Sequence, residues 1–102
     1  FAEEARRRGD GGYGAVIVKD GRIVGEAGSR VMTHNDPTAH GEIEAIRDAC
    51  RRLGTNDLSG AQMYGNARAC PMCEAGAYWA GLARLFHGAS ITDGGAPRLG
   101  RC

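Results

Sequence analysis

Two short stretches, His40-Gly41-Glu42 and Cys70-Pro71-Met72-Cys73, constrain the fold and chemistry of this chain more than any other part of its sequence. A histidine followed by two cysteines at CxxC spacing supplies three ligands for one metal ion. The carboxylate of Glu42 is two residues from the first ligand, so it cannot comfortably bind the same ion and is left free to move protons. A zinc ion with three protein ligands keeps its fourth position open for water, as catalytic sites do. The two motifs therefore predict a hydrolytic zinc site.

The first motif lies at the start of a predicted amphipathic helix. From Thr38 to Leu53 apolar side chains recur every three or four residues, and Gly54 follows as a stop. His40 and Glu42 are therefore expected in the first turn of this helix. The apolar stripe consists of Ile43, Ile46, Ala49, Cys50 and Leu53.

The second motif lies at the start of another predicted helix. Pro71 suits a first helical position, so Cys70 is expected to cap a helix that runs to about Ala80. Both halves of the metal site then lie at helix N-termini. Exposed N–H groups at such an end carry roughly half a positive charge, which favours thiolate over thiol.

The predicted strands are short and are separated by turn residues. Tyr13–Val18 and Arg22–Ala27 are expected to pair as a hairpin around the tight turn Asp20-Gly21. Residues 61–65 and 84–88 predict two further strands, joined through the second helix as a right-handed parallel crossover. Elsewhere the sequence predicts a helix over residues 1–8 ended by Gly9 to Gly12, a polar loop over residues 29–37, and a loop or tail over residues 94–100.

Size and charge narrow the function further. The 102 residues predict one domain, 1–102, and a chain that begins without Met and ends on Arg101-Cys102 is expected to have been trimmed at both ends. Thirteen basic and twelve acidic side chains give a net charge of +1, which favours a small substrate over a nucleic acid. The apolar runs are shorter than a membrane span, and no secretory pattern opens the chain. CxxC beside a ligand-type histidine indicates metal binding in a reducing, cytoplasmic compartment.

The residues of the predicted site have distinct roles. A neutral imidazole from His40 and thiolates from Cys70 and Cys73 leave a bound zinc ion with no net charge, and such an ion lowers the pKa of its water to about 7. Glu42 could take the proton from this water and pass it to a ring nitrogen and then to a leaving amine, acting as base and acid. This combination of motifs is the signature of zinc deaminases.

A structural zinc site is the alternative, and it would need a fourth protein ligand. The candidates are Cys50, which falls on the apolar stripe, His87 at a strand end, Cys102 in the tail, and His34 in the loop before the first helix. His34 is the most credible of these. The catalytic interpretation remains favoured because a structural ion has no use for Glu42.

The stretches Asp36 to Arg47 and Cys70 to Ala80 resemble the cytidine deaminase-like superfamily, in the branch of guanine, cytosine and tRNA adenosine deaminases. The similarity runs from Gly11 to about Pro97. It implies a three-layer α/β/α fold around a mixed five-stranded sheet, zinc-dependent hydrolytic deamination and a homodimer. The segment Gly11 to Val18 and the tripeptide Tyr78-Trp79-Ala80 most resemble guanine deaminases, so guanine leads as the expected substrate and cytosine follows.

Several positions depart from the family pattern, and all of them concern substrate recognition. Ala69 stands where the family usually has a proline, Arg68 where a glutamate is common, and Ser29 where many members place an asparagine that binds the base or ribose. The family's GGPFGA is here the shorter Gly12 to Ala15. The acidic C-terminal residues that hold guanine find no match in Gly94 to Arg98.

The expected substrate contacts follow from this comparison and from side-chain chemistry. The resemblance implies that the amides of Gly41 and Cys70 stabilise the carbonyl region of the substrate or a zinc-bound hydroxide. An aromatic face could stack on a heterocycle. Tyr78 and Phe86 are expected in the core, whereas Trp79 could line the pocket or a subunit contact, and Asn66 could hold a loop or touch substrate. The full set of expected substrate contacts is Tyr13, Ser29, Gly41, Asn66, Arg68 and Trp79.

The sequence thus predicts a zinc-dependent nucleobase or nucleoside deaminase of purine or pyrimidine metabolism. Two alternatives stay open: a deaminase acting on tRNA or single-stranded DNA, and a domain of the same fold that binds zinc without catalysis.

Overall fold

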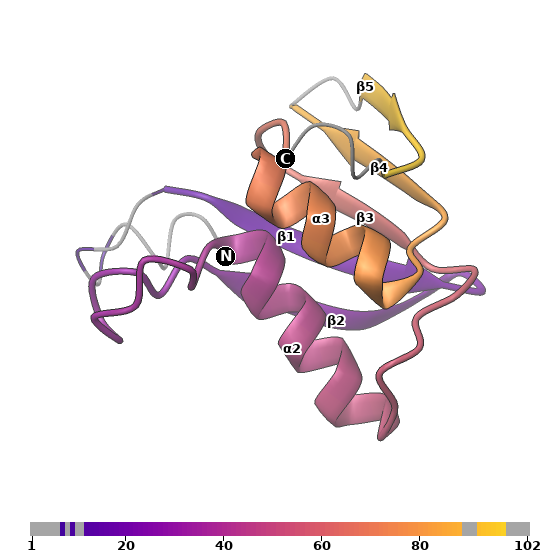
Figure 1. The fold of residues 1–102 in the computed structure, drawn as a ribbon, viewed down its shortest axis with the longest axis horizontal. Helices are drawn as coiled ribbons and strands as arrows, with labels where there is room; N and C mark the ends of the chain where they lie inside the picture. Colours follow the sequence, from indigo (N-terminus) through magenta and orange to yellow (C-terminus); the bar gives the residue numbers. More distant parts are fainter. Residues whose placement is uncertain (1–6, 8, 10–11, 89–91, 98–102) are drawn as a thin grey trace.

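Five short strands form one mixed sheet in the computed structural model, which describes residues 7, 9, 12–88 and 92–97 (Figure 1). Their order across the sheet is β2-β1-β3-β4-β5. Strands β3 and β4 are parallel, and the other neighbouring pairs are antiparallel. The strands are β1 (Gly14–Lys19), β2 (Arg22–Gly28), β3 (Gln62–Gly65), β4 (Arg84–His87) and β5 (Thr92–Gly95). The expected mixed five-stranded sheet is confirmed.

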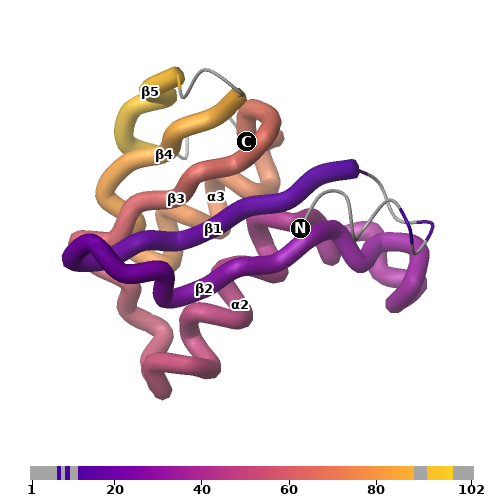
Figure 2. The backbone as a smooth tube through the Cα atoms, turned by 180° about the vertical axis from the view of Figure 1, so that it is seen from behind, coloured from indigo at the N-terminus to yellow at the C-terminus, as the bar shows by residue number. Residues whose placement is uncertain are grey.

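Two helices, α2 (Gly41–Leu53) and α3 (Pro71–Ala80), cover one face of this sheet. The view from behind shows the strands in front of both helices (Figure 2). Of the three layers that the family resemblance implies, the described residues therefore supply two. In this part of the chain no helix combines the length and apolar character needed to cross a membrane. The helix predicted over residues 1–8 falls outside the described residues except for Arg7.

The hairpin between β1 and β2 forms at the predicted turn. Asp20 and Gly21 have φ angles of 54° and 74°, and Lys19 pairs directly with Arg22. Two positive φ angles in a two-residue loop match the right-handed twist of the flanking strands, which is why Asp-Gly favours this turn. The register shifts once, between Ile17 and Val18, which the sequence does not reveal.

Helix α2 packs unusually closely on β2. A Cβ atom added at Gly25 would lie 2.6 Å from the Cβ of Ala49 and 2.7 Å from the backbone oxygen of Ala45. Only glycine leaves room for this approach. The contact fixes the height of α2 above the sheet, and so fixes the position of the metal motif at its start.

The core between the sheet and the helices is built largely from small side chains. Ile17, Leu58 and Met63 are its largest fully buried apolar residues. Around them lie buried alanines that allow close packing of the layers: Ala15, Ala45, Ala49, Ala61, Ala77 and Ala80.

The structure corrects the sequence prediction in two elements. Helix α2 starts at Gly41 and not at Thr38, because the preceding residues are held in a turn. Leu53 of the predicted apolar stripe is 44% exposed in the last turn of α2. Strand β5 occupies the first part of the predicted Gly-rich loop. It is too short for an alternating pattern and is held by pairing with β4 and by a 2.6 Å ion pair between Arg84 and Asp93. Residues 98–100 of that loop lie outside the described residues.

Candidate metal centre

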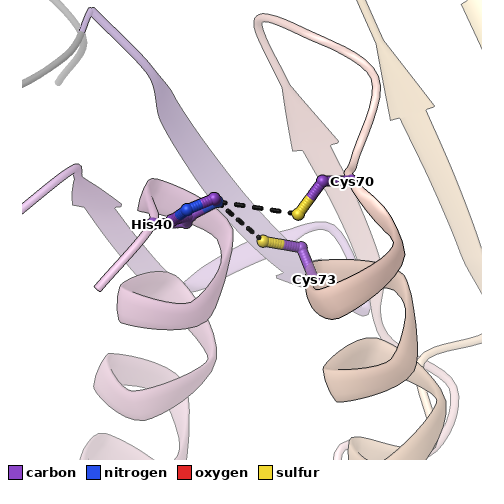
Figure 3. A group of neighbouring side chains, drawn as sticks. All are labelled: His40, Cys70 and Cys73. Carbon is purple, nitrogen blue, oxygen red and sulfur yellow. Dashed lines mark hydrogen bonds between the residues drawn. The ribbon is translucent and has the colours of Figure 1, made fainter. Parts of the chain in front are cut away.

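His40, Cys70 and Cys73 come together between the N-terminal ends of α2 and α3 (Figure 3). His40 is the N-cap of α2, one residue before the helix and not in its first turn as predicted, while Cys70 is the N-cap of α3. The Nδ1 atom of His40 lies 3.6 Å from Sγ of Cys70 and 3.5 Å from Sγ of Cys73. All three ligand atoms lie within 4.8 Å of one another.

These separations fit a tetrahedral zinc ion. Bond lengths of about 2.0–2.1 Å to nitrogen and about 2.3 Å to sulfur place the nitrogen and sulfur ligands about 3.6 Å apart. Both N–S distances agree with that value. The three side chains could therefore hold one zinc ion without rearrangement, with Nδ1 as the histidine ligand.

A compact turn fixes the approach of the chain to His40. The carboxylate of Asp36 accepts hydrogen bonds from the hydroxyl of Thr38 at 2.7 Å and from its amide at 2.9 Å. These two bonds lower the pKa of Asp36 below its ordinary value. The amide of Arg30 donates to the carbonyl of Ala39 across the base of the loop at 2.8 Å. The histidine is thus presented by a hydrogen-bonded loop.

The other candidate ligands lie elsewhere in the described part of the chain. The ring of His34 approaches Glu44, with Nδ1 3.9 Å from a carboxylate oxygen. Cys50 packs against the core, and His87 lines a separate small cavity. Cys102 lies outside the described residues. Among those residues, the group that could hold a metal contains three ligands and no fourth, which fits an open coordination position.

A buried carboxylate adjoins the ligands. Glu42 is 7% exposed, and burial raises its pKa above the ordinary value, although the nearby His40 ring and Cys73 thiol oppose the shift. Burial, the Glu42 carboxylate and Cys70 all raise the pKa of the Cys73 thiol. This thiol therefore keeps its proton until a cation replaces it, and Glu42 is in an environment suited to carrying a proton.

A cavity of about 440 Å³ opens in front of this group. That volume suits a small-molecule ligand. Three of the predicted substrate contacts, Tyr13, Ser29 and Arg68, line it. Sequence reasoning missed Val31, Met32 and Ala67, and the only signal was a pair of apolar residues in an otherwise polar loop. Among the described residues, the lining consists of Tyr13, Ser29, Val31, Met32, His40, Glu42, Ala67, Arg68 and Cys70.

Two of the lining residues differ in how they are held. Tyr13 is 55% exposed, so its ring is available at the mouth of the cavity. Ser29 is 3% exposed, and its side-chain oxygen accepts a 3.4 Å hydrogen bond from the amide of Val31. Its amide donates to the carbonyl of Tyr13 at 2.9 Å. Ser29 therefore helps to shape the loop that walls the cavity.

The other predicted contacts do not line this cavity. The side chain of Asn66 accepts a hydrogen bond from the amide of Gly14 at 3.0 Å and donates one to the carbonyl of Gly12 at 2.8 Å, so it ties the loop after β3 to the start of β1. Gly41 is buried, and an added Cβ would lie 2.9 Å from the carbonyl oxygen of Tyr13. Trp79 is 79% exposed near the end of α3.

The two aromatic residues expected in the core differ in their surroundings. Tyr78 is 49% exposed, so its expected core position is wrong, because it lies on the outer side of α3. Phe86 is partly buried and stacks on Tyr64, with ring centroids 4.7 Å apart.

A second, smaller cavity lies on the other side of Glu42. Its volume is about 20 Å³, enough for a single water molecule. Glu74, a buried residue beside Cys73 that sequence reasoning missed, lines it. Glu42, Ala67 and Arg68 border both cavities.

Comparison with known proteins agrees with this geometry. The chain is 47% identical over 94 residues to guanine deaminase of Bacillus subtilis (strain 168), covering 91% of this chain and 60% of that protein. It is 42% identical over 99 residues to tRNA-specific adenosine deaminase of Agrobacterium fabrum (strain C58 / ATCC 33970), covering 97% of this chain and 65% of that protein. The chain thus spans less than two thirds of either relative.

A solved structure is also similar. It comes from studies of A-to-I editing by tRNA:A34 deaminases at the wobble position of transfer RNA, and it superposes with a TM-score of 0.82 at 42% identity, covering 85% of this chain and 63% of the other. Residues 1–89 match the cytidine and deoxycytidylate deaminase zinc-binding region. The chain therefore belongs to the family of cytidine and deoxycytidylate deaminase zinc-binding domains.

Proposed function

We propose that this chain is a zinc-dependent deaminase that hydrolyses the exocyclic amine of a nucleobase or nucleoside and releases ammonia. The observation that carries the proposal is the position of Nδ1 of His40, 3.5 and 3.6 Å from two cysteine sulfurs, with the buried carboxylate of Glu42 beside them. Three ligands leave a position for the reacting molecule, and a cavity of about 440 Å³ leads to it.

The proposed mechanism gives each residue one task. His40, Cys70 and Cys73 would hold a zinc ion, which when bound would lower the pKa of a water molecule to about 7. Glu42 accepts a proton from the attacking water through its carboxylate and transfers it to a ring nitrogen. The water oxygen adds to the ring carbon that bears the amine. Glu42 then carries the second proton to the departing nitrogen, the C–N bond breaks, and a carbonyl and ammonia remain.

Guanine is the first substrate that we propose, and cytosine the second. The similarity to a guanine deaminase supports this order. The cavity also fits a flat ring, because the half-exposed ring of Tyr13 stands at its mouth and the apolar side chains of Val31 and Met32 line its wall. Such a lining offers stacking and apolar contact to either face of a heterocycle.

The direct test is ammonia release by zinc-loaded protein from guanine, cytosine, adenine, their nucleosides and aminotriazines, with metal-stripped protein as the control. The proposal predicts release from at least one ring, guanine first, and none after the metal is removed. If zinc-loaded protein releases no ammonia from any compound of the panel, the result would instead favour a domain of this fold that binds zinc without catalysis.

A deaminase acting on tRNA is the second candidate, because the chain is 42% identical to a tRNA-specific adenosine deaminase over 97% of its length. The net charge of +1 argues for the small substrate, since binding a polyanion normally relies on several basic contacts. A gel shift with tRNA and single-stranded DNA at rising salt separates the two. Tight, salt-sensitive binding with ammonia release from tRNA alone would reverse our order of preference.

We also propose that the protein acts as a homodimer in the cytoplasm. Two observations support the dimer. Strands β2 and β5 are the edges of the described sheet, and proteins commonly cover such edges; Trp79 is 79% exposed. Sedimentation of the zinc-loaded protein tests the dimer, and only monomer at high concentration would contradict it.

A further inference from the structure

Arg68 carries a guanidinium group at the edge of the candidate site without a protein partner. It lies in the turn between β3 and α3, two residues before Cys70, and it is exposed. It borders both the larger and the smaller cavity. In the described part of the chain it makes no hydrogen bond or ion pair. Four other arginines of the described residues are paired with carboxylates: Arg47, Arg51, Arg52 and Arg84.

Apart from Arg68, the charged groups at the larger cavity already have a role. Among its lining residues, Glu42 is the only carboxylate and is assigned to proton transfer, while Arg68 is the only lysine or arginine. Two thiolates and one neutral imidazole leave a bound zinc ion with no net charge. The charge that remains available to a ligand in this cavity is therefore the positive charge of Arg68.

We propose that Arg68 gives the site a preference for substrates in which the amino-bearing ring, or a ribose attached to it, carries one anionic oxygen group, either a carboxylate or a phosphate. This inference rests on the proposed deaminase function and adds a preference within its substrate class, for anionic derivatives of guanine or cytosine over the neutral compounds. A guanidinium presents donors in a planar fork that matches both oxyanions, and such charge-assisted bonds are roughly twice as strong as neutral ones. The cavity volume of about 440 Å³ is in the range of sites for ligands larger than a bare ring.

The same geometry argues against a polynucleotide as the source of the anion. Strands are held by several phosphate contacts, and their affinity depends steeply on salt for that reason. The part of the lining that the structure describes supplies a single cation. One oxyanion on a small molecule matches one guanidinium.

Binding and turnover of matched neutral and anionic ligands test the proposal. The pairs are cytidine with cytidine 5′-monophosphate, guanosine with guanosine 5′-monophosphate, and cytosine with 5-carboxycytosine, so that the phosphate and carboxylate arms are separate. Calorimetry on zinc-loaded Glu42→Gln protein measures affinity without turnover. Arg68→Gln, Arg68→Lys and Arg68→Glu are then each introduced into the Glu42→Gln protein and measured in the same way. Arg22→Gln is the control, because Arg22 lies at the hairpin between β1 and β2 and lines neither cavity.

We expect the anionic member of at least one pair to bind more tightly than the neutral member. Arg68→Gln should reduce that preference about ten- to a hundredfold, Arg68→Lys should keep part of it, and Arg68→Glu should reverse it. The control should retain the preference. Equal binding of both members in every pair, or an unchanged preference in Arg68→Gln, would overturn the inference. Calorimetry on the Glu42→Gln background measures affinity without turnover. A result that contradicts the role of Arg68 can therefore be told apart from a lack of deaminase activity, which would appear as no ammonia release from any ligand.

Discussion

The contact between Gly25 and α2 predicts that a single added methyl group disturbs both stability and metal binding. In Gly25→Ala the new Cβ would lie 2.6 Å from the Cβ of Ala49, about 0.8 Å closer than the 3.4 Å at which ordinary contact begins. It would also lie 2.7 Å from the backbone oxygen of Ala45, which no rotamer change can move. Helix α2 must therefore shift away from β2. Overpacking of this kind costs about 1–3 kcal/mol.

The helix shift has a second consequence at the metal centre. His40 caps α2, so movement of the helix changes the distances of 3.5 and 3.6 Å from its Nδ1 atom to the two cysteine sulfurs. We expect weaker zinc binding together with the loss of stability. For a domain of this size the melting temperature should fall by roughly 4–8 °C for each kcal/mol lost.

Urea unfolding of the metal-free protein and calorimetric titration with zinc measure the two effects separately. Ala49→Gly in the same chain removes one of the three atoms that clash, so the double variant should recover about 0.5 kcal/mol or more relative to the sum of the single changes. The contacts with the backbone oxygen of Ala45 and with the backbone nitrogen of residue 49, at 2.9 Å, remain, and recovery should be partial. If Gly25→Ala protein unfolds at the wild-type urea concentration and binds zinc equally well, the contact at Gly25 does not set the position of α2.

Three further predictions concern the site and its support. Replacing any one of the three proposed ligands by alanine should abolish zinc retention through dialysis, as measured by metal analysis, whereas Cys50→Ala should retain zinc because this thiol packs against the core. Zinc affinity measured by calorimetry should rise with pH. Burial raises the pKa of the Cys73 thiol, and protons compete with the metal for this thiol throughout the range below that pKa. A zinc affinity that is independent of pH would contradict this prediction. Asn66→Ala should lower the free energy of unfolding by about 1–3 kcal/mol by removing two hydrogen bonds to the start of β1. Asn56→Ala should have little effect in the same urea titration, because the Asn56 side chain makes no hydrogen bond among the described residues.

Local sequence signals predicted the elements that position the site. Asp20-Gly21 predicted the hairpin because its two positive φ angles are a local requirement. Pro71 and Gly54 marked a helix start and a helix end for similar local reasons. Both metal motifs adjoin helix N-termini, so the prediction placed the three candidate ligands at two helix starts although it began α2 at Thr38 and not at Gly41.

Features set by contacts between distant residues were not predictable in the same way. Strand β5 owes its position to pairing with β4, and its four residues show no alternation. Leu53 is 44% exposed although it continues the apolar stripe of α2, because exposure depends on the surrounding elements, which helical periodicity does not report. Met32 lines the cavity because the loop before α2 folds over it, and loop shape of this kind is not encoded in a local pattern.

Proton transfer by Glu42 at a zinc site is tested most directly by a comparison of Glu42→Gln with Glu44→Gln. Both residues lie near the start of α2, but Glu44 pairs with Arg47 and lines neither cavity. Each variant is loaded with zinc, its metal content is checked, and kcat for ammonia release is measured on the best substrate of the panel. We predict a loss of about 10²–10⁴-fold in Glu42→Gln and near wild-type activity in Glu44→Gln. Equal activity of zinc-loaded Glu42→Gln and wild-type protein would contradict the claim.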